Sequence, residues 1–163
     1  MARGFTFVEL LVTMSILVIV TAMALPLATG STRAATDAAA RLLASDLEHA
    51  QMLALSRPDV RVALAIDADG TGWSIIDADA PGTPLEDKLD AAHRGRPLRT
   101  VLGEGRAQVG THVVVDAQAA GKTLVFTPLG GLETRLPQVR MRSGETTSTL
   151  LVDADTGFSR LDH

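Results

Sequence analysis

The stretch GFTFVELLVTMSILVIVTAMALPL, residues 4–27, decides the fold, because it is an apolar run long enough to cross a bilayer as one helix. A single basic residue, Arg3, stands in front of it. A secretory signal peptide would have a shorter apolar segment and a cleavage site of small residues. A plain signal anchor, with Arg3 on the cytoplasmic side, fits the length of the run. Both interpretations leave one residue of the run unexplained.

Glu9 is that residue. A carboxylate inside an apolar membrane helix costs several kcal/mol unless it is paired, so it is normally retained for a function. Glu9 lies about one helical turn after Phe5. A cut after Gly4 would give Phe5 a new cationic amine, which is the obvious partner for Glu9 on a neighbouring copy. The residues alone therefore leave two interpretations open, a membrane anchor and an assembly device.

The segment GFTFVEL, from Gly4 to Leu10, resembles the type IV prepilin cleavage and methylation motif. In that motif a glycine precedes a phenylalanine, and a glutamate stands at the fifth position after the glycine. The resemblance implies that residues 1–4 are a leader. It implies that a prepilin peptidase cuts after Gly4 on the cytoplasmic face and N-methylates Phe5. It also implies that Glu9 pairs with the N-terminal amine of an adjacent subunit when a filament assembles.

The helical pattern continues beyond the apolar run. Residues 5–28 are the expected transmembrane helix, and residues 29–57 are its expected amphipathic continuation. Arg57-Pro58 is the expected stop, because the residue before a proline is biased away from helix. At 1.5 Å per residue the whole rod would be about 80 Å long. One face of its second half carries small and aliphatic residues at three- and four-residue spacing: Ala35, Ala39, Leu42, Leu43, Leu47, Ala50, Leu53 and Ala54.

Pro26 lies where many type IV pilin-like proteins have a proline that loosens the helix. Because proline removes a backbone hydrogen bond, we predict a helix kink at Pro26, with Gly30 as a second point of bending. The apolar face of residues 29–57 is interpreted as the side on which the helix packs against its own domain.

The remainder, residues 58–163, is predicted to be a β-rich domain. Residues 60–66 and 73–77 are β-prone runs on either side of an Asp-Gly turn, so they are expected to form a hairpin. A polar loop is expected at about 81–96. Turn signals separate the further strand candidates, which are 98–102, 112–116, 123–127, 138–142, 147–152 and 158–161. One long helix followed only by strands predicts an α+β fold with the helix packed on antiparallel β-sheets.

This order of elements is similar to one branch of the type IV pilin-like superfamily, the GspH/FimT-type minor pseudopilins and pilins. Four stretches carry the resemblance: LEHAQMLALSR at 47–57, GWSI at 72–75, LVFTPLG at 124–130, and a terminal strand with Gly157 and Arg160. The resemblance covers most of the chain and implies a pilin-like fold, in which the helix is the spine of the domain.

The composition excludes several classes of site. The 163 residues carry a formal charge of −4, so the chain as a whole is not expected to be a dedicated nucleic-acid binder. The absence of cysteine excludes disulfides and thiolate chemistry. Aromatic residues make up only 3% of the chain, which leaves few platforms for stacking bases or sugars. The expected core is therefore aliphatic.

No catalytic constellation emerges from the motifs. There is no G-x-S-x-G nucleophile elbow. Gly103-Glu-Gly105 begins like a dinucleotide fingerprint, but Gln108 replaces the third glycine and no helix is expected to follow, so it is interpreted as a turn. We therefore expect no enzyme activity, no cofactor and no metal. No zinc-site spacing connects the histidines, which are His49, His93, His112 and His163.

Two acidic loops, DADG at 67–70 and DADTG at 153–157, raise the question of calcium. An EF-hand loop that began at Asp67 would need glutamate at the position of Ala78. Asp-Gly is a favoured turn pair. Turn chemistry is therefore the preferred interpretation of both loops, and a calcium site is the alternative.

Charge is segregated along the chain, with acidic residues predominating in 59–90 and basic residues in 94–142. A basic half could contact DNA phosphates, which is one known use of FimT-like minor pilins. The simpler explanation is solvated strands and salt links between the two halves. In the DNA-binding members of this branch, a G-R-x-R pattern near the C-terminus is implicated in DNA binding. Residues 157–160 read GFSR, without the first arginine, so DNA is a disfavoured partner.

The preferred interpretation is a minor pseudopilin of a type II secretion system. It would be anchored in the bacterial inner membrane by one helix, with its C-terminal domain in the periplasm, and assembled into a pseudopilus that helps export folded proteins. Its expected partners are other pseudopilins or pilins and the prepilin peptidase. A FimT-like minor type IV pilin, for pilus assembly or DNA uptake, is the first alternative. The second is a signal-anchored periplasmic enzyme or ligand-binding domain.

Overall fold

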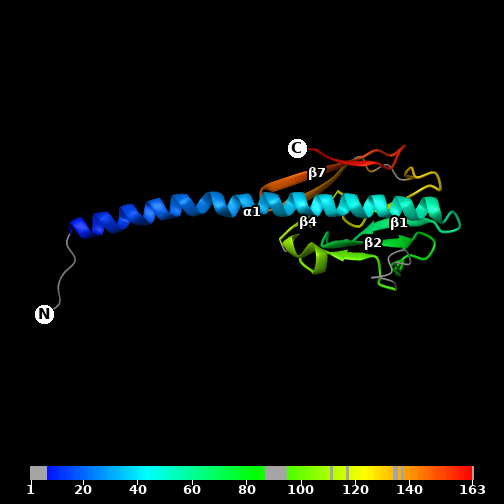
Figure 1. The fold of residues 1–163 in the computed structure, drawn as a ribbon, viewed down its shortest axis with the longest axis horizontal. Helices are drawn as coiled ribbons and strands as arrows, with labels where there is room; N and C mark the ends of the chain where they lie inside the picture. Colours follow the sequence, from blue (N-terminus) through cyan, green and yellow to red (C-terminus); the bar gives the residue numbers. More distant parts are fainter. Residues whose placement is uncertain are drawn as a thin grey trace.

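The molecule is a long helical rod with a domain built on its C-terminal half (Figure 1). The computed structural model describes residues 7–86, 95–110, 112–116, 118–133, 136 and 138–162, without the side chains of 22–31, 109 and 110. Within these described residues, two four-stranded antiparallel sheets accompany the helix. The predicted α+β fold, with the N-terminal helix packed on antiparallel β-sheets, is therefore confirmed.

Helix α1, Phe7–Ser56, is continuous, and its 50 residues correspond to about 75 Å of axis at 1.5 Å per residue. The backbone stays helical past Pro26 and Gly30. The kink predicted at Pro26 stays a prediction, because the side chains of 22–31 lie outside the description. The helix ends where Arg57-Pro58 was expected to stop it, and Arg57 N donates the last bond, to Leu53 O at 2.9 Å.

The second half of α1 buries the face that the sequence predicts. Leu43 and Leu47 are fully buried against the domain, and alanines before and after them on the same face are buried as well. Burial of one leucine side chain contributes about 1.5–3 kcal/mol. This stripe is therefore the main attachment of the domain to the helix. It includes Ala39, Ala40, Leu43, Leu47, Ala50, Leu53 and Ala54.

The first sheet has the strand order β3-β2-β1-β5. Strands β1 and β2 form the predicted hairpin, in which Ile66 pairs with Trp73. Strand β2 is almost entirely buried, as expected for a strand covered on both faces. The bounds are Val62–Ile66 for β1, Gly72–Asp77 for β2, Arg99–Val101 for β3 and Thr123–Val125 for β5.

The second sheet has the strand order β4-β6-β7-β8. Strand β7 buries Ser148, Leu150 and Val152, each separated by a more exposed residue, which is the pattern of a strand with one face on the core. The bounds are Val114–Val115 for β4, Gln138–Ser143 for β6, Thr146–Val152 for β7 and Ser159–Asp162 for β8.

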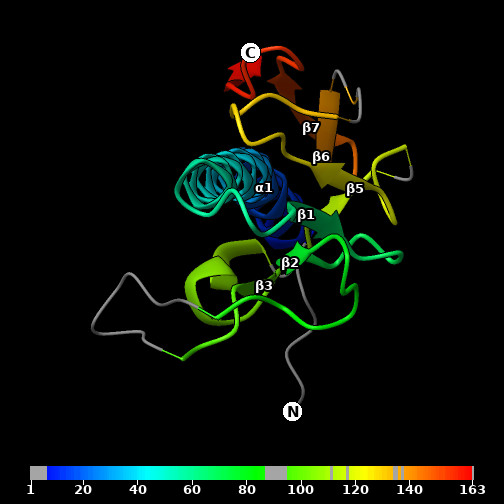
Figure 2. The same cartoon turned by 90° about the vertical axis from the view of Figure 1, so that its right-hand side faces the viewer.

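The two sheets meet at the turn between β1 and β2. Val115 N of β4 donates to Gly70 O of this turn at 2.8 Å. Gly70 has a φ of 70°, and a Cβ there would collide with the carbonyl oxygen of Val115. Only glycine combines this φ with this approach, so the Asp-Gly turn links the sheets. Helix α1 contacts β1 of one sheet and β6, β7 and β8 of the other, and in Figure 2 the two sheets lie on different sides of it.

Two loops are joined at the C-terminal end of α1. Gln51 Nε2 donates to Gly130 O at 2.8 Å and to Thr156 O at 2.6 Å. Gly157 has a φ of 72°, and a Cβ there would collide with Gly130 O. These contacts give a physical reason for two of the family-like features of the sequence, the PLG of residues 128–130 and Gly157.

One local prediction is wrong. The predicted turn is present at Gly103-Glu104, but the sequence predicts no helix after it, whereas a short 3₁₀-helix, η1, spans Gly105–Gly110 with a kink at Ala107. The chain folds back here, because Ala107 N donates to Glu104 O at 2.8 Å and Gly103 N donates to Ala107 O at 2.9 Å. This buries Ala107 in the hydrophobic core. The helix is stabilised by packing against residues that are distant in the sequence, so hydrophobic periodicity over six residues could not reveal it.

The other strands lie within a few residues of their predicted positions. Strand β4 has only two residues where 112–116 was expected. Within the predicted loop 81–96, Pro84 bridges Ile76 and Glu86 bridges Pro97, so the described part of this loop follows the edge of the first sheet. Residues 87–94 of the loop lie outside the description.

Candidate assembly interface

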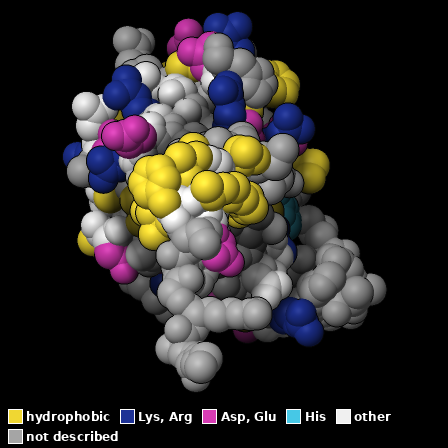
Figure 3. All heavy atoms as spheres, turned by 90° about the vertical axis from the view of Figure 1, so that its left-hand side faces the viewer, with side chains coloured by type: hydrophobic (Ala, Val, Ile, Leu, Met, Phe, Trp, Pro, Cys, Tyr) yellow, Lys and Arg dark blue, Asp and Glu magenta, His cyan; other side chains and the backbone are white. Residues whose placement is uncertain are grey.

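The N-terminal half of α1 projects from the domain with apolar side chains on all sides. Every described side chain from 7 to 21 is exposed; Phe7 is 78% exposed and Val20 is 60% exposed. Figure 3 looks at this end of the molecule and shows apolar side chains gathered on it. Burial of one such side chain would gain about 1.5–3 kcal/mol. A continuous apolar surface of this kind marks a contact with lipid or with another protein.

Glu9 lies in the first turn of α1 and is exposed. Its neighbours in sequence are apolar, and Phe7 and Leu10 are both more than half exposed. Gly4 and Phe5 lie outside the described residues. The cleavage and N-methylation predicted for Gly4 and Phe5, and the assembly role predicted for Glu9, therefore stay predictions.

Between residues 7 and 21, the described hydroxyl side chains are satisfied within the helix. Each donates to a backbone carbonyl three or four residues earlier, at 2.7–2.9 Å: Thr13 to Leu10, Ser15 to Leu11 and Thr21 to Leu17. A hydroxyl bonded inside its own helix needs no water partner. The segment can therefore enter apolar surroundings without leaving these groups unsatisfied.

Among the residues that the structure describes, no helix has both the length and the hydropathy needed to cross a membrane. The predicted span, 5–28, is described only in part, because residues 5 and 6 and the side chains from 22 onward lie outside the description. The span therefore stays a prediction.

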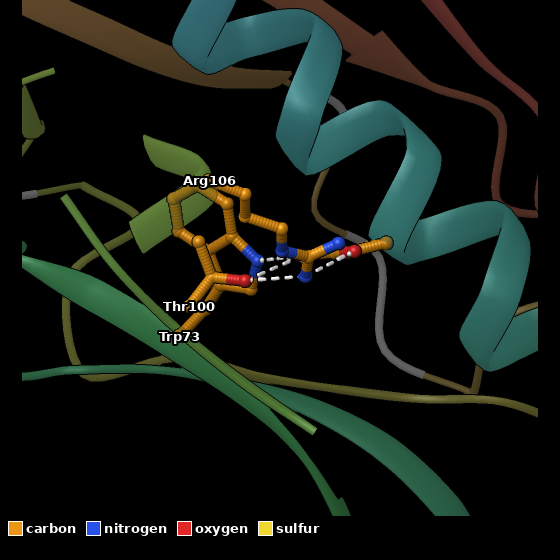
Figure 4. A network of polar contacts seen from close by, with 4 residues as sticks. Trp73, Thr100 and Arg106 are labelled. Carbon is orange, nitrogen blue, oxygen red and sulfur yellow. Dashed lines mark hydrogen bonds and ion pairs between the residues drawn. The ribbon is translucent and has the colours of Figure 1, made fainter. Parts of the chain in front are cut away.

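The second half of α1 carries a buried carboxylate, Asp46, which is 3% exposed. Trp73 Nε1 donates to its Oδ2 at 2.7 Å, and Thr100 Oγ1 donates to the same oxygen at 2.9 Å. The guanidinium of Arg106 donates to both carboxylate oxygens, at 2.7 and 2.6 Å. Figure 4 shows the three donor side chains converging, and they come from β2, β3 and η1. One carboxylate thus connects the helix to three other elements.

Asp46 was not among the residues predicted from the sequence, because its partners lie at positions 73, 100 and 106, far apart in the chain. The available signal was a single acidic residue within the apolar stripe, between Leu43 and Leu47. A carboxylate on the buried face of an amphipathic helix requires hydrogen-bond donors there. The lone tryptophan of the chain, at the start of a strand, was a donor that this requirement could have identified.

The two acidic loops use their carboxylates to build turns. Asp69 Oδ1 accepts hydrogen bonds from Thr71 N at 3.0 Å and Thr71 Oγ1 at 2.8 Å. Asp153 Oδ1 accepts from the backbone N of Thr156 and of Asp155, both at 3.0 Å. These hydrogen bonds hold the pKa of Asp69 and of Asp153 below the ordinary value of 3.8, and the largest effect comes from the backbone N–H groups. The hydrogen bonds therefore stabilise the folded state fully at a pH above the ordinary pKa. This stabilisation is lost as the pH falls through the lowered pKa values.

Within the described residues, no group of three or more His, Asp or Glu side chains could hold a metal ion. Asp67 of the first acidic loop pairs with Arg99, at 2.9 Å between Oδ2 and a guanidinium nitrogen. Of the histidines, His49 is half-buried on α1 and His112 is exposed, while His93 and His163 lie outside the description.

Ion pairs on the surface of the domain involve residues of both the acidic and the basic part of the sequence. Besides the pair of Arg99 with Asp67, Arg61 contacts Asp79 at 2.9 Å and Glu133 at 2.7 Å. These partners are surface residues, and each such pair contributes at most about 1 kcal/mol. Of these pairs, that of Arg99 with Asp67 joins a base of the basic part to an acid of the acidic part, which is the kind of salt link that the simpler explanation of the sequence expects.

We predict that Asp46→Asn destabilises the domain by about 2–3 kcal/mol, because the amide cannot accept at both positions and leaves buried donors unsatisfied. Urea unfolding of a fragment from Thr32 to His163, followed by the emission of Trp73, measures the change. The fragment retains the buried stripe of α1. The control is Glu48→Gln, an exposed change on the same helix, which should stay within about 0.5 kcal/mol of wild type. Equal midpoints for the two variants would contradict the assigned role of Asp46.

Comparison with known families identifies two regions of the chain. Residues 39–157 match the family model described as Type II transport protein GspH. Residues 1–25 match the prokaryotic N-terminal methylation motif. No curated protein and no solved structure gave a significant match. The first match covers more than half of the chain and includes the buried stripe of α1 and all the named strands except β8. The chain therefore belongs to the GspH family of type II transport proteins and is a GspH-type minor pseudopilin.

Proposed function

We propose that the chain enters the periplasmic pseudopilus of a type II secretion system through the N-terminal half of α1, and so helps to export folded proteins. One observation carries this proposal: residues 7–20 expose a continuous apolar surface on a helix that runs unbroken into the core of a folded domain. Such a helix can place one half among lipids or packed helices while the other half holds the domain. The description of the matched family as a transport protein supports the proposal.

Four segments follow from this proposal. Residues 1–4 are a leader, 5–28 span the inner membrane, 29–57 continue the helix, and 58–163 form a periplasmic domain. The internal hydrogen bonds of the hydroxyl side chains support burial of the second segment in lipid. Arg3 on the cytoplasmic side agrees with the positive-inside rule. Pro26 would loosen the helix near the membrane surface.

Glu9 would act between subunits. In lipid, a carboxylate is tolerated when a cation reaches it. Cleavage after Gly4 creates such a cation, the amine of Phe5, on each processed copy. A subunit inserted in the wrong register would leave both charges unpaired in apolar surroundings, which is far more costly than in water. The pair would therefore select the position of each subunit in the filament.

The contribution of the domain would be assembly and partner contact rather than catalysis. Its partners would be other pseudopilins, with the prepilin peptidase as a transient partner at the membrane. The long buried stripe and the Asp46 cluster support this role, because they fix the orientation of the domain on the helix that the filament would hold.

We predict that the mature chain begins at Phe5. Coexpression with a prepilin peptidase should remove residues 1–4 and add one methyl group, and intact-mass measurement reports both changes. Replacing Gly4 by a bulky residue should block the cut but leave membrane insertion intact, because the apolar run is unchanged. An uncut chain, or a cut near residues 28–30, would contradict the proposal.

We predict that Glu9→Ala leaves membrane insertion and cleavage after Gly4 intact but abolishes recruitment into the filament. The substitution removes a charge from the apolar segment, so insertion should be unchanged or slightly improved. Copurification with partner pseudopilins from membranes, beside a cleavage assay on the same sample, measures the effect. Glu145→Ala, an exposed change in the β6–β7 turn, is the control. Normal copurification and secretion by Glu9→Ala would show that Glu9 has no assembly role.

A further inference from the structure

The exposed large apolar side chains of the domain gather at the C-terminal end of α1. Two belong to the last turns of the helix, and the other two belong to the loops that Gln51 joins. In Figure 1 these loops lie at the end of the domain farther from the N-terminus. Within the described part of the domain, the four residues and their exposed fractions are Met52 at 60%, Leu55 at 53%, Leu129 at 92% and Phe158 at 66%. We name these four residues the distal patch.

The contacts beneath the distal patch hold it in one shape. Gln51 Nε2 bonds to a carbonyl in each of the two loops, and Gly157 packs directly on Gly130 O. Leu129 precedes Gly130 and Phe158 follows Gly157, so both side chains stand on fixed backbone. A Cβ at Gly130 would lie 3.6 Å from Leu55, which places the helix side of the patch beside the same loop. Because the backbone beneath the distal patch is already ordered, little backbone entropy is lost when a partner covers the patch.

The described charged residues that lie near the members of the distal patch in the sequence or on the helix are mainly acidic. Asp153 N donates to Phe158 O at 2.9 Å, and the carbonyl of Asp155 lies over Gly131. Both carboxylate residues are exposed, and so are Glu48 and Asp59, while the basic residues nearby are Arg57, half-buried, and Arg160. A partner surface that complements this end of the domain therefore combines apolar side chains with basic ones.

A second copy of this chain does not supply that surface. Two distal patches placed face to face would bring their acidic rims together. Outside the patch, the exposed large apolar side chains of the described chain lie on residues 7–20. The end of that segment is about 48 Å back along α1 from Met52, at 1.5 Å per residue. In the proposed assembly it is occupied by lipid or by neighbouring helices, and so it is not available to a distal patch.

We propose that the distal patch is the docking site for a different pilin-like subunit, one that presents an apolar surface flanked by lysine or arginine. This inference rests on the proposed function and extends it, because it assigns a specific contact to the domain in addition to that of the helix. Phe158 and Leu129 are the anchors, since they are the most exposed of the four and stand on the most constrained backbone. The acidic rim orients the partner.

Photo-crosslinking in cells that carry the whole secretion system tests the proposal. Each test variant of the full chain carries one benzoylphenylalanine, at position 129 or at position 158. Each control variant carries it at one exposed position away from the patch, that of Glu104 or that of Thr147. We expect light-dependent adducts at 129 and 158 with a different chain that carries an N-terminal methylation motif, identified by mass spectrometry, and none at the controls. The double variant Leu129→Ala with Phe158→Ala should lower copurification of that chain at least about tenfold.

Reversing a charge of the acidic rim provides a second test of the proposal. Asp155→Lys should lower copurification several-fold, whereas Glu145→Lys, at the opposite end of the second sheet, should not. Adducts with a second copy or with an exported protein, or unchanged copurification of the double variant, would overturn the proposal. Correct cleavage at Gly4 with no adduct at 129 or 158 would overturn this inference alone. A chain that is never cut would overturn the proposed function and this inference together.

Discussion

The unbroken hydrogen-bond ladder of α1 joins two surfaces that require different surroundings. The C-terminal half buries its apolar stripe under two sheets, and there the domain itself excludes water. The N-terminal half exposes apolar side chains on all sides, so something other than this chain has to cover it. Because one helix carries both surfaces, the position of residues 7–20 determines the orientation of the domain. The proposed membrane insertion, filament assembly and distal contact all depend on this link.

Among the described polar contacts between the helix and the domain, two sets are each centred on one side chain of α1. Asp46 gathers donors from β2, β3 and η1, and Gln51 joins the loops at 128–131 and 153–157. Apolar packing alone is tolerant of small displacements, whereas these contacts are satisfied in one arrangement only. The chain has no cysteine, so covalent links do not serve this purpose. The contacts therefore specify the geometry in which a partner would meet the distal patch.

Much of this fold could be predicted from the sequence, because its signals are local. The spacing of Leu43 and Leu47 identified the buried face of the helix, and Arg57-Pro58 identified its end. Glycines and the Asp69-Gly70 pair separated strands that lie close to their predicted positions. The missed features depend on residues distant in the chain: Asp46 finds its donors at 73, 100 and 106, and η1 forms to bury Ala107. Of the predicted site residues, Glu9 is described on the projecting helix, while Gly4 and Phe5 lie outside the description, so the motif alone indicates their roles.

The central claim is that the apolar N-terminal half of α1 is covered on all sides, whereas the outer face of its C-terminal half meets water. The chain contains no cysteine, so single cysteines can report on each position. Val12→Cys, Ile16→Cys and Arg41→Cys all place the thiol at a position that the isolated chain exposes. In cells with a permeabilised outer membrane, a membrane-impermeant maleimide should label position 41 readily. Positions 12 and 16 should resist labelling until detergent is added. Labelling of positions 12 and 16 as fast as position 41, without detergent, would contradict the account.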